Sequence, residues 1–395
     1  MSKYKRLDKE RPVVQHMGVF KKQLTTFEAI ALIVSGTIGA GVLGIPYAVA
    51  KVGLVPGIIY IVVMGLLMMG INLLIGEVAV RTRQNLQLVG LTRKYLGKIG
   101  GWLMTGLFYT MLFGALLAYV IGEGETLSAL FGGSNFFWSI LFFLFGSTVI
   151  FLGMKTVKKT ELILSLTIFV VVVIIASISA PHVSLPNFAY HDLAYILFPY
   201  GVLMFAFHSA NTIPEAHSIL INKDKSFKKV IFISSLITIV VYTIFAITVV
   251  GVTGVNTTEI ATIGLGGVIG KAGFVLGNIF AALAMGTSFL VIGLSLKDSL
   301  SWDYKMPKVL SVSIVCGVPF IFFLFGLRSF IAVIDVIGGV LISLETVLII
   351  LIYWRAKQTG DLKQLKFNVH HAALLVAVLA IVLAIGTVYS VAKLF

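Results

Sequence analysis

Cysteine, charge and proline are all scarce in this chain. Its 395 residues include one cysteine, Cys316, so the chain can form neither an internal disulfide framework nor a cysteine-based zinc site. Charged residues make up only 12% of the sequence, and the longest polar stretches are the first 26 residues and the short connections. These absences leave no room for a soluble catalytic domain and argue against thiol redox chemistry.

Apolar residues dominate instead. They account for 58% of the sequence, and the mean hydropathy is +1.04, far above that of soluble domains of this length. A bilayer core of about 30 Å is crossed by about 20 apolar residues in a helix. Eleven such runs are present, which predict transmembrane helices at 27–50, 54–80, 101–124, 135–153, 160–179, 193–220, 230–251, 270–297, 307–325, 329–354 and 369–392. The first run is too long for a signal-peptide core and no small-residue cleavage site follows it, so we expect it to be a span of the mature chain.

The formal net charge of +14 follows a pattern that predicts orientation. With the N-terminus in the cytoplasm, 26 of the 30 Lys and Arg residues fall in cytoplasmic segments; the exceptions are Lys51, Lys271, Arg328 and Lys393. Because cytoplasmic loops are enriched in Lys and Arg, we expect the N-terminus inside, the C-terminus outside and the cytoplasmic (plasma) membrane as the location. Binding of anionic lipid headgroups is the only other role that this charge suggests, and no nucleic acid partner is expected.

The first predicted span has an unusual centre, with Gly36, Gly39 and Gly41 within six residues. Each glycine costs a helix interior about 1 kcal/mol relative to alanine, and Pro46 follows shortly after. We therefore expect the helix to unwind near residues 36–41. Lipid cannot hydrogen-bond to freed backbone groups, so an unwound segment at this depth is buried in protein or lines a cavity. Such a segment is a candidate binding site, and the alternative is that the glycines allow close packing of helices.

The sixth predicted span is the second irregular one. Five polar residues lie at its centre: His208, Ser209, Asn211, Thr212 and Glu215. Pro214 lies among them and removes a backbone hydrogen-bond donor. No other predicted span has so many polar groups at its midpoint.

The two irregular spans are five helices apart, which predicts the domain organisation. Because five is odd, a second set of five helices enters the membrane in the opposite direction, as in the inverted repeats of many secondary transporters. We expect a cytoplasmic tail at 1–26 and one transmembrane transport domain at 27–395. Its parts would be a first repeat at about 27–179, a second at about 193–354, and an extra helix at about 369–392. In this architecture helix N-termini receive an anionic group and unwound carbonyls receive a cation, which suits a zwitterionic amino acid.

Several segments resemble the amino acid/polyamine/organocation superfamily, and within it the amino acid/auxin permease and hydroxy/aromatic amino acid permease branches. The segments are Gly36 to Pro46 in the first span, Phe205 to His208 with Pro214-Glu215 in the sixth, and Ala284 to Asp298 in the eighth. The resemblance implies the LeuT-type fold, with substrate between the broken first and sixth helices and beside the third and eighth. The substrate contacts that it implies are Ser35, Gly36, Thr37, Gly39 and Gly41 in the first span and Phe207, His208, Ser209 and Asn211 in the sixth.

The same resemblance suggests a coupling ion. Sodium sites of this fold combine first-helix carbonyls with eighth-helix hydroxyls, and the matching positions are Ser35, Ile38, Thr287 and Ser288. Ser and Thr in membrane helices also bond to their own backbone. These hydroxyls could therefore either bind sodium or only hydrogen-bond to the helix backbone. Some proton-coupled relatives carry a lysine on the fifth helix, and the run from Thr160 to Ser179 has none.

Ionisable groups inside the membrane are costly and point to function. His208 and Glu215 are therefore the candidates for proton coupling or gating. His208 is the better candidate for carrying a proton, because histidine ordinarily titrates near neutral pH. For His208 the alternative is a neutral hydrogen bond between helices, and for Glu215 it is stabilisation of a helix N-terminus.

Other acidic residues have more ordinary expected roles. Glu77 and Arg81 have the spacing of a salt bridge on one helix. Asp335 and Glu345 are expected to pair with other helices or to gate. Glu123 and Glu125, near the outer end of the third span, are expected to be solvated.

Taken together, these features predict a secondary active transporter that moves neutral amino acids by alternating access, driven by a sodium or proton gradient. The alternative is a non-transporting amino acid sensor or receptor on the same fold. An enzyme is not expected, because the sequence lacks the motifs of membrane-embedded hydrolases. No cofactor is expected beyond a possible sodium ion. The expected partners are the amino acid, the coupling cation and membrane lipid.

Overall fold

The computed structural model describes residues 25–153, 170–171, 173–220, 223–302, 305–362, 367–369 and 371–393. The predicted tail at 1–26 lies almost wholly outside these residues. Of the fifth predicted span, 160–179, only the end is described.

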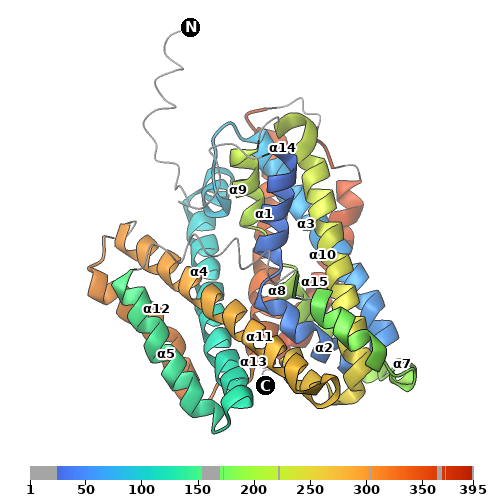
Figure 1. Ribbon diagram of the computed structural model, residues 1–395. Helices are drawn as coiled ribbons and strands as arrows, with labels where there is room; N and C mark the ends of the chain where they lie inside the picture. Colours follow the sequence, from blue (N-terminus) through green and yellow to red (C-terminus); the bar gives the residue numbers. More distant parts are fainter. Residues whose placement is uncertain are drawn as a thin grey trace.

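The described residues form helices joined by short connections (Figure 1). In chain order the helices are α1 (Thr26–Thr37), η1 (Ala40–Gly44), α2 (Ile45–Val52), α3 (Leu54–Arg81), α4 (Leu88–Phe131), α5 (Asn135–Leu152), η2 (Ala180–His182), α7 (Pro186–Ala189), η3 (Leu193–Tyr195), α8 (Pro199–Ala206), α9 (Thr212–Ile219), α10 (Lys223–Thr253), η4 (Gly254–Asn256), α11 (Ala261–Trp302), α12 (Lys308–Leu324), α13 (Phe330–Val336), η5 (Ile337–Ile342), α14 (Ser343–Thr359) and α15 (Ala372–Ala392). η5 is π-helical, and a further apolar helix covers Val173–His182.

Long apolar helices confirm the all-helical prediction. Among the described residues, seven helices are long and apolar enough to cross a membrane, and the bent pair Thr26–Thr37 and Ala40–Val52 makes an eighth span. Three of the eleven predicted spans are not in this count. The fifth is largely undescribed, and the sixth is split into two helices of eight residues, α8 and α9. The ninth forms α12, Lys308–Leu324, which has only 17 residues. Eleven therefore remains a prediction.

Two long helices each contain a glycine that separates a surface segment from a span. Gly97 in α4 has φ 74° and Gly270 in α11 has φ 78°, a left-handed conformation that residues with a Cβ rarely adopt. The spans predicted to begin at 101 and at 270 start at or just after these bends.

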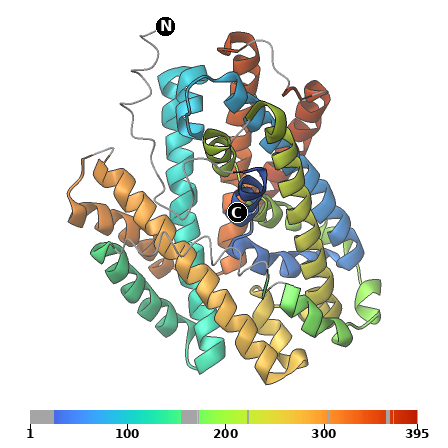
Figure 2. The same cartoon turned by 45° about the horizontal axis from the view of Figure 1, so that its top comes forward.

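Helices pack on both sides of α4. In Figures 1 and 2, α5 and α12 lie on one side of α4, α1, α3, α10 and α15 lie on the other, and α11 crosses α4 from one side to the other. Apolar side chains on the outside face lipid: α5 and α15 are only 28% and 22% buried over their most apolar windows. The buried residues of α15 include Leu379, Leu383, Gly386 and Ser390, which recur at helical spacing and form one stripe.

Glycines allow α8 to cross η5 closely. A Cβ on Gly338 would lie 1.8 Å from the carbonyl oxygen of Gly201, so neither position tolerates a side chain. The Tyr200 hydroxyl lies 2.7 Å from Ser343 Oγ, and Lys393 Nζ lies 2.7 Å from Asp335 Oδ2. These contacts join α8, the π-helical segment and the end of α15.

Two acidic groups join the ends of helices near the loops. Glu77 is fully buried and accepts hydrogen bonds from Arg81 at 2.6 Å and from the Val369 N–H at 2.7 Å, which confirms the predicted Glu77–Arg81 salt bridge. Asp361 accepts from the Arg83 N–H at 2.9 Å and from the Lys94 ammonium. The hydrogen bond from Lys94 lowers the pKa of Asp361 below its ordinary value.

These two sites differ in burial, and this difference generates a stability prediction. Glu77→Gln leaves the buried Arg81 without a carboxylate and should destabilise the protein by about 3–5 kcal/mol. Asp361→Asn removes a partly exposed pair and should cost less than about 1 kcal/mol. Thermal unfolding in detergent measures both variants.

The pH dependence of this measurement has a defined sign. Because the folded-state pKa of Asp361 is lowered, its contribution is present above the unfolded pKa of about 3.9 and is lost as the pH falls through the folded value. The difference between wild type and Asp361→Asn should therefore vanish in acid. Equal losses of stability in the two variants at neutral pH would contradict this account.

Candidate functional site

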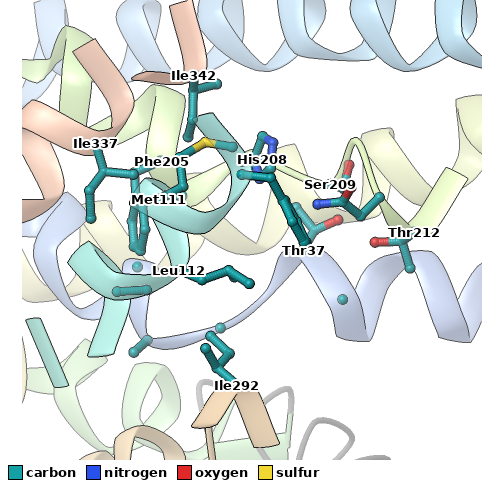
Figure 3. A pocket seen from close by; sticks show the side chains of 18 of the residues that line it. Thr37, Met111, Leu112, Phe205, His208, Ser209, Thr212, Ile292, Ile337 and Ile342 are labelled. Atoms are coloured by element: carbon teal, nitrogen blue, oxygen red, sulfur yellow. The ribbon is translucent and has the colours of Figure 1, made fainter. Parts of the chain in front are cut away.

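A cavity of about 230 Å³ lies where both broken helices are interrupted (Figure 3). Its walls come from the two breaks, from α4, from α11 and from η5. The lining residues are Gly36, Thr37, Gly39, Ala40, Gly41, Phe108, Met111, Leu112, Ala115, Tyr119, Phe205, Ala206, His208, Ser209, Asn211, Thr212, Ile292, Ile337 and Ile342.

The first break follows Thr37 and confirms the predicted unwinding. Ile38 leaves the helical region with ψ 87°, Gly39 is extended, and the helices on either side are bent by 51°. The flanking glycines bring the two broken helices together. A Cβ on Gly36 would lie 2.8 Å from the Thr212 side chain, and one on Gly41 would lie 3.0 Å from the Cα of Ala206.

The second break separates α8 from α9 and confirms the predicted irregularity of the sixth span. α8 begins with Pro199 and ends at Ala206, and α9 begins at Thr212. Pro214 falls in the first turn of α9, where a backbone N–H would have no partner within the helix. The missing N–H of the proline therefore costs α9 no internal hydrogen bond. Glu215 lies in the same turn, as expected for a charge that opposes the helix dipole.

One tyrosine connects the two breaks. The Tyr242 hydroxyl on α10 lies 3.0 Å from the carbonyl oxygen of Thr37 and 2.8 Å from that of Ala206. Tyr242 is fully buried, and its ring contacts that of Phe207 with the centroids 4.8 Å apart. The Thr37 carbonyl also accepts from the Gly39 N–H at 3.0 Å, so the Tyr242 hydroxyl is the additional donor at a place that lipid cannot hydrate. The sequence analysis did not single out Tyr242, because a tyrosine within an apolar run has no distinguishing pattern.

Two side chains of the second break bond to other helices in different directions. His208 Nε2 lies 2.6 Å from Glu345 Oε2 on α14. Ser209, the next residue, accepts a hydrogen bond of 2.9 Å from the Asn72 side chain on α3. The predicted pairing of Glu345 and Asp335 with other helices is thus observed, since Asp335 binds Lys393.

The helix ends give the cavity an electrostatic pattern. α1 and α8 end at the cavity, while η1 and α9 begin there. The first N–H groups of a helix and its last carbonyls lack partners within the helix, and they carry partial positive and negative charge respectively. The cavity therefore offers both N–H donors and carbonyl acceptors.

The predicted substrate contacts meet for the most part at this cavity. Its lining includes Gly36, Thr37, Gly39, Gly41, His208, Ser209 and Asn211. Ser35 and Phe207 are not among the described lining residues: the Ser35 hydroxyl donates to the Leu32 carbonyl at 3.1 Å, and Phe207 packs on Tyr242. Their contact with substrate stays a prediction.

Sequence reasoning missed much of the wall. Phe108, Met111, Leu112 and Tyr119 on α4 line the cavity, but apolar residues on a long apolar helix carry no signal of their own. The signal that could have found them is their recurrence at helical spacing on one face.

Two of the predicted sodium ligands bond within their own helices. The Ser35 hydroxyl donates to the Leu32 carbonyl, and the Thr287 hydroxyl donates to the Leu283 carbonyl at 2.7 Å. Ile38 is 1% exposed, and Ser288 is half-buried. Neither Thr287 nor Ser288 is among the described lining residues. The described part of the chain also contains no group of three or more His, Cys, Asp or Glu arranged for a metal ion. The sodium site stays a prediction.

One acidic residue differs from the expectation. Glu123 was expected to be solvated, but it is only 2% exposed, and its Oε1 lies 3.0 Å from the Cβ position of Gly286. The reason is that α4 continues to Phe131, so Glu123 lies two turns inside the helix end. Glu125 is partly buried.

Two solved structures show the same fold. The chain is similar to MhsT in complex with L-phenylalanine, with a TM-score of 0.66 and 13% identity over 93% of this chain and 98% of that one. It is also similar to the Eremococcus coleocola manganese transporter, with a TM-score of 0.66 and 15% identity over 92% of this chain and 85% of that one. The predicted LeuT-type fold with broken first and sixth helices is confirmed.

Relatives at the level of sequence are amino acid transporters. Glutamine transporter 2 of Aliivibrio fischeri is 24% identical over 86% of this chain and 91% of its own length. Tyrosine-specific transport system 1 of Haemophilus influenzae is 26% identical over 83% and 87%, respectively. These relatives are transporters and not enzymes, and the apolar helices make this chain an integral, multi-pass membrane protein. The model of the tryptophan/tyrosine permease family matches residues 22–392, and the chain therefore belongs to that family.

Proposed function

We propose that this chain is a secondary active transporter that carries neutral amino acids with large apolar or aromatic side chains by alternating access. The observation that carries the proposal is the cavity at the two helix breaks, which has polar backbone on one side and apolar side chains on the other.

The backbone at the breaks suits the common part of every amino acid. The N–H groups that begin η1 and α9 would receive the α-carboxylate, as helix N-termini do for anions. The carbonyls at the ends of α1 and α8 would receive the ammonium. A carbonyl oxygen has two lone pairs, and the single hydroxyl proton of Tyr242 is donated to one of the two carbonyls at a time, so the Ala206 carbonyl keeps at least one acceptor site for the ammonium.

The opposite wall suits an apolar side chain. Figure 3 shows Met111, Ile337 and Ile342 across the cavity from Ser209 and Thr212. Within the described lining, His208 and Tyr119 are the ionisable side chains, and no Asp, Glu, Lys or Arg takes part. A charged substrate side chain would thus lack a counter-charge, which favours neutral substrates.

The coupling ion, the branch of the superfamily and the orientation belong to the same proposal. A sodium or proton gradient drives transport, the N-terminus is cytoplasmic, the C-terminus is external and the plasma membrane is the location. The arrangement of Lys and Arg supports this orientation. The hydroxy/aromatic amino acid permease branch is favoured over the amino acid/auxin branch by the apolar wall. The alternative of a non-transporting sensor is less favoured, because the relatives are transporters.

Uptake by the purified full chain in proteoliposomes tests the proposal. Tryptophan, tyrosine, phenylalanine and glutamine are compared with aspartate and lysine, under sodium and pH gradients imposed separately. We expect saturable uptake of neutral amino acids, greatest for the aromatic ones, and no uptake of aspartate or lysine. Correctly folded protein that shows neither uptake nor exchange with any of these would contradict transport.

A glycine pair tests the location of the site. Gly41→Ala places a methyl group against the backbone of Ala206 and forces the broken helices apart at a cost of about 1–3 kcal/mol. If this cost falls on the binding-competent state, substrate affinity should fall about tenfold or more. Gly106→Ala on α4 is the matched control, because a Cβ there meets nothing within 4 Å. Wild-type affinity in Gly41→Ala would place the substrate elsewhere.

A further inference from the structure

The contact between His208 and Glu345 is unusual among the acid pairs of this protein. Glu345 is fully buried, its Oε2 lies 2.6 Å from His208 Nε2, and its Oε1 is buried without a hydrogen-bond partner in the described part of the chain. His208 is 18% exposed at its side chain and lines the cavity. A fully buried carboxylate is thus connected to the cavity through one histidine.

Two other buried acids are paired with an arginine or a lysine. Glu77 binds Arg81, and Asp335 binds Lys393. The partner of Glu345 is a histidine, whose charge depends on whether it holds a proton. Of the three pairs, only this one can change its charge at physiological pH without separating.

Among the described residues, the lysines and arginines of the helices packed on α14 are either exposed or already paired. The titratable groups of these helices (α3, α4, α15 and η5) are Tyr60, Glu77, Arg81, Arg93, Lys94, Tyr95, Lys98, Tyr109, Tyr119, Glu123, Glu125 and Tyr389, and of these Arg93, Lys94 and Lys98 are exposed. Arg81 is bound by Glu77, and Tyr109 bonds to Ser299. On α14 itself, Tyr353, Arg355 and Lys357 lie two or more turns further along. The charge of Glu345 is therefore balanced locally by His208.

One proton makes the pair neutral in either arrangement. The proton can lie on the imidazole, giving an imidazolium and a carboxylate, or on the carboxyl group beside a neutral imidazole, and both keep the hydrogen bond. Removing it leaves a bare carboxylate in the membrane interior, which is costly.

The position of His208 connects this proton to the substrate. His208 lies in the break between α8 and α9, beside Ser209 and Asn211 in the same lining. A substrate carboxylate at the break would stabilise the imidazolium, and the imidazolium would stabilise the carboxylate. Coupling of this kind is reciprocal, so each ligand strengthens the binding of the other.

We propose that His208 and Glu345 together form the proton-binding site that couples transport to a proton gradient, with one proton carried per amino acid. The inference rests on the proposed transport function and assigns its coupling ion. The proton is taken from the outer solution and is released to the inner solution with the substrate, so no other reactant is required.

The test uses the full chain in proteoliposomes with Glu345→Gln, which keeps the shape of the side chain but cannot ionise. Tryptophan, tyrosine, phenylalanine and glutamine are each measured for exchange without a gradient, for accumulation under an acid-outside pH gradient, and for acidification of the lumen with a trapped pH dye. We expect Glu345→Gln to lose accumulation by about tenfold or more relative to its own rate of exchange, and to lose acidification.

Asp335→Asn is the matched control. It also neutralises a buried carboxylate with one basic partner, but that partner, Lys393, is 36% exposed at its side chain and can remain hydrated. Asp335→Asn should keep both accumulation and acidification.

Three outcomes separate this inference from the proposed function. Wild-type accumulation and acidification in Glu345→Gln would overturn the inference. Wild-type protein that accumulates substrate under a sodium gradient but not under a pH gradient would overturn it too, and transport would stand. Absence of all uptake and exchange in wild type would instead refute the proposed function.

Wild-type protein alone provides a second test if Glu345→Gln does not fold. Each amino acid is added to detergent-solubilised protein in weakly buffered solution near pH 7, and a pH indicator follows proton uptake. Binding should draw protons from the solution, and a substrate that binds without any proton uptake across pH 6 to 8 would overturn the inference.

Discussion

The hydroxyl of Tyr242 is the contact on which the centre of this protein depends. Two helices stop inside the membrane, and each leaves carbonyl groups that lipid cannot hydrate. Tyr242 lies within hydrogen-bond distance of the last residues of both α1 and α8. A single buried hydroxyl thus connects the two interruptions, and the cavity lies beside them.

Glycines determine how close the surrounding helices come. Gly36 and Gly41 bring the first broken helix against the second, and Gly201 and Gly338 let α8 cross the π-helical segment with backbone in contact. A π-helical turn within a long helix is frequently found at a functional site. Here it shapes the wall that Ile337 and Ile342 contribute to the cavity. The tight crossing leaves α8 little freedom relative to α13 and η5.

Much of this arrangement was predictable from sequence, and the physical reason is the bilayer. Hydrophobic runs, three closely spaced glycines and one polar cluster were sufficient to locate the broken first and sixth helices, because lipid penalises irregular backbone everywhere else. The Glu77–Arg81 bridge was predictable from helical spacing. The partnership of His208 with Glu345 was not, because 137 residues separate them and no local pattern records which helices touch. The burial of Glu123 was missed for a similar reason, since the true end of α4 lies further along the chain than its hydrophobic run suggests.

The consecutive positions of His208 and Ser209 have a mechanical consequence. The side chain of His208 bonds to Glu345 on α14, and that of Ser209 bonds to Asn72 on α3. The peptide unit between these two residues is therefore held by two helices that are far apart in sequence. Rotation of that unit alters both hydrogen bonds at once, and a small rotation weakens both without forming replacements. Such an element has preferred positions rather than a continuous range, and packed structures of this kind switch between discrete states. The interrupted sixth helix is thus expected to move between discrete positions and not to bend freely at its break.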